Sequence, residues 1–108
     1  MKRTDEAFVH DILMAAGSIR TYVHKVTKAE FLHNAEKRDA VIRQVGIIGE
    51  AASKLSATYR QEHDEVPWKE IIGMRNIVVH QYWEVDMDVL WDVAKHGAPD
   101  LLKLLRQR

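Results

Sequence analysis

A regular apolar pattern between residues 41 and 59 is the strongest constraint that this sequence places on its fold. The apolar side chains recur at alternating steps of four and three residues, at Val41, Val45, Ile48, Ala52, Leu55 and Tyr59. That spacing predicts a helix with a narrow apolar seam, which packs against a partner helix at a shallow crossing angle. A neighbouring face carries Gly46, Gly49 and Ser53. Because glycine weakens a helix interior, we interpret this face as a close helix–helix contact, within the chain or across a dimer.

The residues before the seam predict a first amphipathic helix and a short second one. Thr4 or Asp5 can cap a helix whose apolar face continues through residues 8–26. This helix should end near Thr27, because Thr27 and Glu30 have the spacing of a capping box. A short helical turn is expected to follow.

The residues around and after the seam predict two more long helices and a last one. Asn34 can cap the seam helix, which we expect over residues 35–58. The polar residues 59–65 favour a loop, and Pro67 fits the first turn of the next helix, where its missing N–H does no harm. Asp86 can cap the last helix.

The predicted fold class is all-α, an up-and-down antiparallel helical bundle with four main helices and short helical pieces. We expect one domain over residues 1–108, since the chain is too short for two. Gly97 and Pro99 interrupt the last helix, which predicts a kink or two pieces near residues 96–99. Residues 76–83 are β-branched and aromatic enough for a strand, but the sequence has no obvious partner strand.

Charge and composition exclude several classes of protein. The 16 Lys and Arg residues balance the 16 Asp and Glu residues, so any basic surface for nucleic acid must be local. There is no cysteine, which excludes disulfides, thiolate metal sites and cysteine nucleophiles. No signal-peptide pattern and no stretch of the roughly 20 apolar residues that a membrane helix needs is present. We therefore expect a soluble, cytoplasmic protein with no membrane contact.

Arg75 lies in the middle of an apolar stripe on the helix that follows Pro67. All four residues that share its helical face are apolar: Ile71, Ile72, Val78 and Val79. An unpaired charge there is costly, so Arg75 needs a partner or a ligand, and Glu50 on the seam helix is a candidate across the bundle. His80 lies about 140° further round an ideal helix. The β-branched residues before His80 and the aromatic residues after it predict that the helix ends there. That end would bring a cation, an imidazole and the phenol of Tyr82 together at one helix terminus.

A structural interpretation of the same residues is also open. Arg75 can serve a structural ion pair, His80 can favour the negative end of a helix dipole, and Tyr82 can be a packing aromatic. The other histidines show no spacing typical of a helical zinc site. We interpret them as surface or boundary residues: His10, His24, His33, His63 and His96. We expect no metal and no cofactor.

The arrangement of Arg75, His80 and Tyr82 resembles the RX4HXY motif of the HepT-like ribonuclease toxins of the HEPN superfamily. The flanks are similar as well, with Gly-Met-Arg-Asn at residues 73–76 and Arg-Asp-Ala through Gly-Glu-Ala-Ala at residues 38–52. The segments that resemble the family therefore cover most of the chain. The motif with its tyrosine and both flanks is more specific than Arg-X4-His alone.

The resemblance implies a function and two kinds of partner. It implies the toxin of a type VII-like toxin–antitoxin pair, a metal-independent endoribonuclease whose motifs face each other in a homodimer. The catalytic residues would be Arg75 as phosphate clamp and His80 as acid or base, with Asn76 in support. It further implies an MntA-like nucleotidyltransferase antitoxin that silences the toxin by AMPylation of Tyr82. The alternative is a non-catalytic helical dimer that binds RNA or docks a nucleotidyltransferase.

Overall fold

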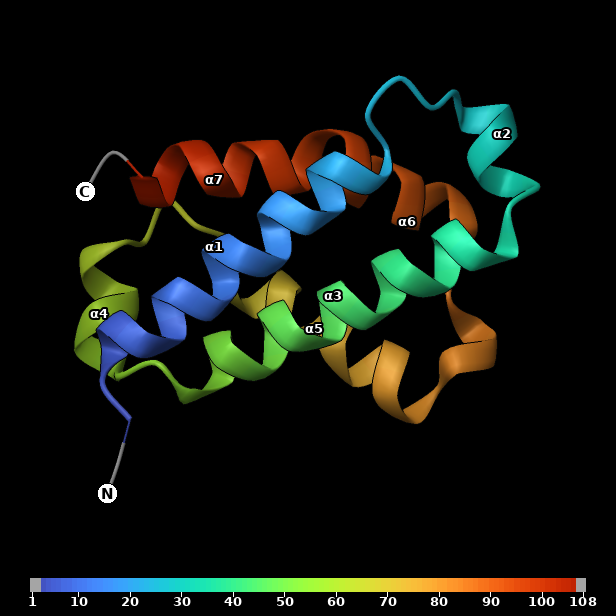
Figure 1. Cartoon of the computed structure of the whole chain (residues 1–108). Coiled ribbons are helices and arrows are strands. Elements are labelled where there is room, and N and C mark those ends of the chain that lie inside the picture. The colour runs from blue at the N-terminus through green and yellow to red at the C-terminus, as the bar shows by residue number, and fades with distance from the viewer. Residues whose placement is uncertain (1–2, 107–108) are drawn as a thin grey trace.

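Four long helical segments form an up-and-down antiparallel bundle in the computed structural model, which describes residues 3–106 (Figure 1). The first two are α1 (Asp5–Tyr22) and α3 (Ala35–Lys54), and the third is α5 (Trp68–His80). The fourth begins as α6 (Met87–Asp92) and continues through a π-helical turn (Val93–Gly97) into α7 (Ala98–Arg106). The all-α prediction is confirmed, and the described residues contain no strand.

Three short helical pieces connect the long helices. α2 (Lys28–Leu32) lies between α1 and α3, and α4 (Ala57–Glu62) lies between α3 and α5. A 3₁₀ turn, Tyr82–Glu84, joins α5 to α6. In Figure 1, α2 and α4 lie at opposite ends of the bundle. Residues 1–2 and 107–108 of the expected domain lie outside the described residues.

The core is built from the predicted apolar faces. The seam residues Val41, Val45, Ile48, Ala52 and Leu55 are all buried. Across from them, α1 buries Ile12, Ala15 and Ile19. α1 packs against both α3 and α7, and α3 packs against α5, so the spatial order is α7, α1, α3, α5. α5 lies against the side of α3 that carries Gly46 and Gly49.

The helix caps follow the prediction closely. The side chains of Thr4, Thr27, Asn34 and Asp86 each accept backbone N–H groups at the start of a helix, and Thr27 and Glu30 form a complete capping box. Pro67 lies one residue before α5, at the N-cap position and not inside the first turn.

Three boundaries differ from the prediction. α1 ends at Tyr22, before a turn in which Lys25 has a φ of 59°, although its apolar face continues to residue 26. α3 ends at Lys54 because Leu55 is extended, and the expected loop at 59–65 contains most of α4. The predicted division of the last helix near residues 96–99 corresponds to the π-helical turn Val93–Gly97, which separates α6 from α7. There the N–H of Ala98 bonds to the carbonyl of Val93, five residues back, so the helix continues past Pro99.

Gly49 sets the distance between α3 and α5. A Cβ on Gly49 would lie 2.0 Å from the Cβ of Arg75 and 3.1 Å from the backbone oxygen of Ile71. At Gly46, one turn earlier, the nearest atom would be a methyl carbon of Val78 at 3.8 Å. The small-residue face is therefore a close contact within the chain, which was one of the two predicted possibilities.

Gly49→Ala should destabilise the fold, whereas Gly46→Ala should not. The Cβ of Arg75 and the backbone oxygen of Ile71 cannot move without the helix, so α5 must shift. The loss in free energy of unfolding should lie toward the upper end of the roughly 1–3 kcal/mol typical of overpacking. The gain in helix propensity returns only about 1 kcal/mol. Urea denaturation followed by circular dichroism measures both variants. Equal stability of Gly49→Ala and Gly46→Ala would contradict the contact.

Candidate functional site

The last turn of α5 and the residues after it carry the predicted site. α5 ends at His80, and the N–H of Gln81 bonds to the carbonyl of Ile77. The side chain of His80 is exposed, as are those of Tyr82 and Trp83 in the following 3₁₀ turn. The predicted helix end at His80 is therefore confirmed, and it leaves three ring side chains facing outward at one end of the bundle.

Arg75 is held against α3 by a carboxylate. Its Nη2 lies 2.6 Å from Oε2 of Glu50, and its Nη1 donates to Oδ1 of Asn76 at 2.9 Å. The Arg75 side chain is 25% exposed, and its buried Nε has no hydrogen-bond partner among the described residues. The predicted Glu50–Arg75 pair is confirmed. Gly49 allows this ion pair, because a Cβ at position 49 would overlap the side chain of Arg75.

His80 has a different environment from Arg75. Five residues separate them on a regular helix, which corresponds to about 7.5 Å along the axis and about 140° of rotation. The hydrogen bonds and ion pairs within residues 3–106 join Arg75 to Glu50 and Asn76, but join His80 to neither Arg75 nor Tyr82. One chain thus presents the guanidinium beside α3 and the imidazole at the open end of α5.

Tyr82 contacts α3 through its hydroxyl group. The hydroxyl donates to Oδ1 of Asp39 at 3.3 Å, and the Tyr82 side chain is 51% exposed. Asp39 was not predicted as a partner of Tyr82. The sequence does contain a pattern that indicates this contact. Asp39, Arg43 and Glu50 recur at helical spacing, so they share the side of α3 that faces α5.

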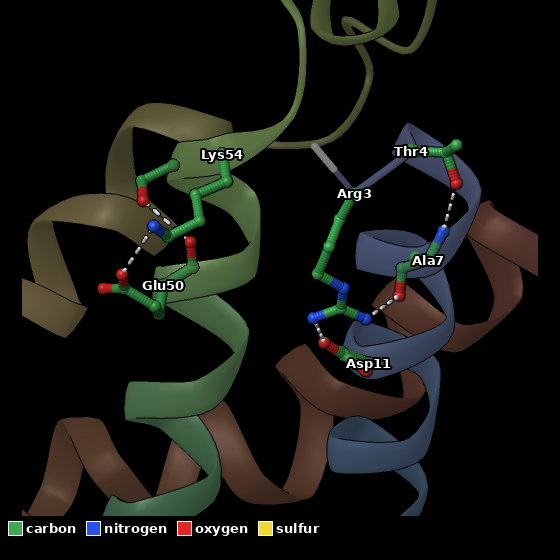
Figure 2. Close-up of polar contacts among 7 residues, drawn as sticks. Arg3, Thr4, Ala7, Asp11, Glu50 and Lys54 are labelled. Carbon is green, nitrogen blue, oxygen red and sulfur yellow. Dashed lines mark hydrogen bonds and ion pairs between the residues drawn. The ribbon is translucent and has the colours of Figure 1, made fainter. Parts of the chain in front are cut away.

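A groove of about 400 Å³ opens beside Arg75, between α3, α5 and the start of α1. It is lined by Arg3, Phe8, Asp11, Arg43, Gly46, Ile47, Glu50, Ala51, Lys54, Arg75 and Val79. Figure 2 shows one end of it, with Arg3 and Asp11 on the α1 side and Glu50 and Lys54 on α3. Four of the lining side chains are cationic and two are carboxylates, so the groove is locally basic on a chain of zero net charge.

A second pocket, of about 380 Å³, lies between α5 and α7 on another side of the bundle. Its lining is mainly apolar, with Ile71, Met74 and Leu101 among its residues, and its only charged side chains are Glu65, Glu70 and Asp100. Carboxylates repel phosphate, so this pocket is unsuited to a nucleic-acid backbone. The basic groove beside Arg75 is the better candidate.

The described residues contain no group of three or more His, Cys, Asp or Glu side chains that could hold a metal ion.

One histidine differs from its interpretation as a surface or boundary residue. His63 is buried, its ring stacks on Tyr59 at 4.1 Å, and its carbonyl accepts a hydrogen bond from Trp68. Within residues 3–106, no helix has the length and apolar character needed to cross a membrane.

Comparisons with known proteins give one consistent family. A family model described as "Ribonuclease HepT-like" matches residues 12–108. A Methanocaldococcus jannaschii protein named "Putative RNase MJ1380" is 38% identical over 102 residues, which cover 94% of each chain. A Thermococcus cleftensis protein named "Probable ribonuclease HepT" is 35% identical over 101 residues, covering 94% of this chain and 92% of the relative. No solved structure matches.

Proposed function

The chain belongs to the HepT-like ribonuclease family, and from this premise we propose that it is an endoribonuclease that cleaves RNA without a metal ion. Arg75 and His80 are its catalytic residues. The observation that carries the proposal is the position of Arg75 in an open, basic groove of a chain from a ribonuclease family. A phosphate entering this groove meets a guanidinium whose donors are already oriented by Glu50 and Asn76.

The reaction begins with attack of a ribose 2′-hydroxyl on the neighbouring phosphate. A proton leaves the 2′-oxygen, the bond from phosphorus to the 5′-oxygen breaks, and that oxygen gains a proton. An imidazole can both accept and donate a proton, and we assign one of these two transfers to His80, whose side chain is exposed. Arg75 stabilises the charge that builds on the phosphate oxygens. Asn76 supports Arg75 by accepting its hydrogen bond.

A homodimer would complete the site, with RNA bound where two motifs face each other. Two features of the single chain support this assembly. His80 and Arg75 make no contact with each other, and the surface around them exposes Ile47, Val79 and Trp83. Exposed apolar side chains around a polar site are typical of interfaces.

The proposed biological role is that of a toxin in a type VII-like pair. Its partner is a nucleotidyltransferase antitoxin that transfers AMP to Tyr82. Tyr82 suits this role because its side chain is exposed. Tyr22 accepts a hydrogen bond from Gln44, and Tyr59 stacks on the buried His63.

The proposal predicts cleavage of RNA by purified, unmodified protein in the presence of EDTA. A panel of RNAs incubated with the protein and separated on denaturing gels measures it. The same preparation should sediment as a dimer at micromolar concentration. Intact RNA throughout would refute the ribonuclease and favour a binding module. Cleavage that stops with EDTA would refute only the metal-free mechanism, and a strictly monomeric species would refute the dimer.

A further inference from the structure

The charges in the basic groove are unevenly paired. Nη1 of Arg3 donates to Asp11 at 2.7 Å, and this hydrogen bond holds the pKa of the Asp11 carboxyl below its usual range. Glu50 accepts from Arg75 at 2.6 Å and lies 3.6 Å from Nζ of Lys54. Both carboxylates are therefore already engaged by neighbouring cations (Figure 2 shows Arg3–Asp11 and Lys54–Glu50).

Arg43 is the remaining cation in this groove. Its side chain is exposed, and no hydrogen bond or ion pair joins it to another residue within 3–106. Its guanidinium thus keeps all of its donors and its full charge for a ligand. A guanidinium is also the side chain whose planar donors best match the oxygens of a phosphate.

The packing of α3 on α5 places Arg43 relative to the proposed catalytic residues. The two helices are antiparallel, with Gly49 beside Arg75 and Gly46 beside Val78. Position 43 lies one turn before Gly46 on α3, opposite the C-terminal end of α5. Val79, in the last turn of α5, also lines the groove, and His80 follows it. Positions 43 and 50 are about 10 Å apart along α3, which separates Arg43 from the Glu50–Arg75 pair.

We propose that this groove binds the backbone of single-stranded RNA, with Arg43 gripping a phosphate next to the one that is cleaved. The proposal rests on the ribonuclease function and extends its substrate contacts beyond Arg75. Arg75 and Arg43 then hold two phosphates of one strand along α3, and the scissile bond is presented toward the end of α5. Contacts of this kind fix the position of the strand and carry no base specificity.

Replacing Arg43 with glutamine should weaken RNA binding about tenfold and make it less sensitive to salt. Each phosphate contact contributes about 0.7 to the slope of log affinity against log salt for a single strand, so the slope should fall by about that amount. The probe is a fluorescein-labelled oligouridylate, and binding is followed by anisotropy over a sodium chloride series. All proteins carry His80→Ala so that the probe stays intact.

Two further variants make the result specific. Arg20→Gln removes the same charge from an exposed position on α1 that does not line the groove, and it should bind like the parent. Arg43→Lys keeps the charge and should retain the slope. Circular dichroism verifies that each variant is folded.

Equal binding by Arg43→Gln and Arg20→Gln would overturn the proposed contact while leaving cleavage by His80 untouched. The slope of log affinity against log salt should fall in Arg43→Gln but not in Arg43→Lys. An equal fall in both variants would also overturn the proposed contact, because the charge of Arg43 would not be its cause. If the unmutated protein binds RNA through Arg43 but cleaves none, the ribonuclease proposal fails and the groove assignment stands.

Discussion

His80→Ala should slow RNA cleavage by about 10²–10⁴-fold, the usual cost of losing a positioned acid or base. Arg75→Ala should slow it by about 10²–10³-fold through loss of charge stabilisation on the phosphate. His80 is exposed at the end of α5, so His80→Ala should leave the bundle intact. Arg75→Ala removes one of the two cations beside Glu50, and Lys54 remains to face that carboxylate. Single-turnover cleavage rates measure both variants.

His24→Ala is the matched control for His80, since it removes an exposed imidazole from the turn after α1. It should cleave at the parent rate. Arg75→Lys tests how Arg75 acts, because it keeps the charge but loses the paired donors that grip a phosphate. A His80→Ala protein that is folded and cleaves as fast as His24→Ala would remove His80 from the mechanism.

Tyr82→Phe should cleave RNA at the parent rate but escape silencing completely. The variant keeps the ring and loses the hydroxyl that would accept AMP from ATP with release of pyrophosphate. It also loses a single hydrogen bond to Asp39 at an exposed position, which is a small change in stability. AMP on Tyr82 would place a phosphodiester and an adenine beside the end of α5, where negative charge opposes the entry of RNA.

The measurement is mass spectrometry and cleavage after incubation with a cognate nucleotidyltransferase and ATP. Tyr22→Phe is the control, because Tyr22 is only partly exposed and accepts a hydrogen bond from Gln44. It should be silenced like the parent. AMP on another residue, or a Tyr82→Phe protein that is silenced as readily as Tyr22→Phe, would contradict the assignment.

Local chemistry predicted most of the bundle. The caps at Thr4, Thr27, Asn34 and Asp86 depend on residues within one turn, and the seam of α3 depends on a simple period. One boundary that was wrong, the start of α4, depends on a distant contact. Ser56 starts α4 directly after α3, and its N–H and hydroxyl donate to Asp5, 51 residues away. These bonds also hold the pKa of Asp5 below its usual range. A scan along the sequence cannot detect such a contact.

The site was predictable where charge balance demanded a partner. Arg75 in an apolar stripe required a counter-charge, and Glu50 supplies it. The sequence did not predict that Asp39 would contact Tyr82 or that Arg43 would line the same groove as Arg75, because both depend on how α5 lies along α3. The separation of His80 from Arg75 also follows from helix geometry, since the helix continues regularly to His80.

The chemical identity of the new RNA ends tests the proposed mechanism most directly. RNA cleaved by the purified protein in EDTA should carry a 2′,3′-cyclic phosphate on one fragment and a 5′-hydroxyl on the other, because the 2′-oxygen is the attacking group. Mass spectrometry of the fragments distinguishes these ends from those left by water attack. Fragments that carry a 5′-phosphate and a 3′-hydroxyl would contradict cleavage by Arg75 and His80 through the neighbouring ribose.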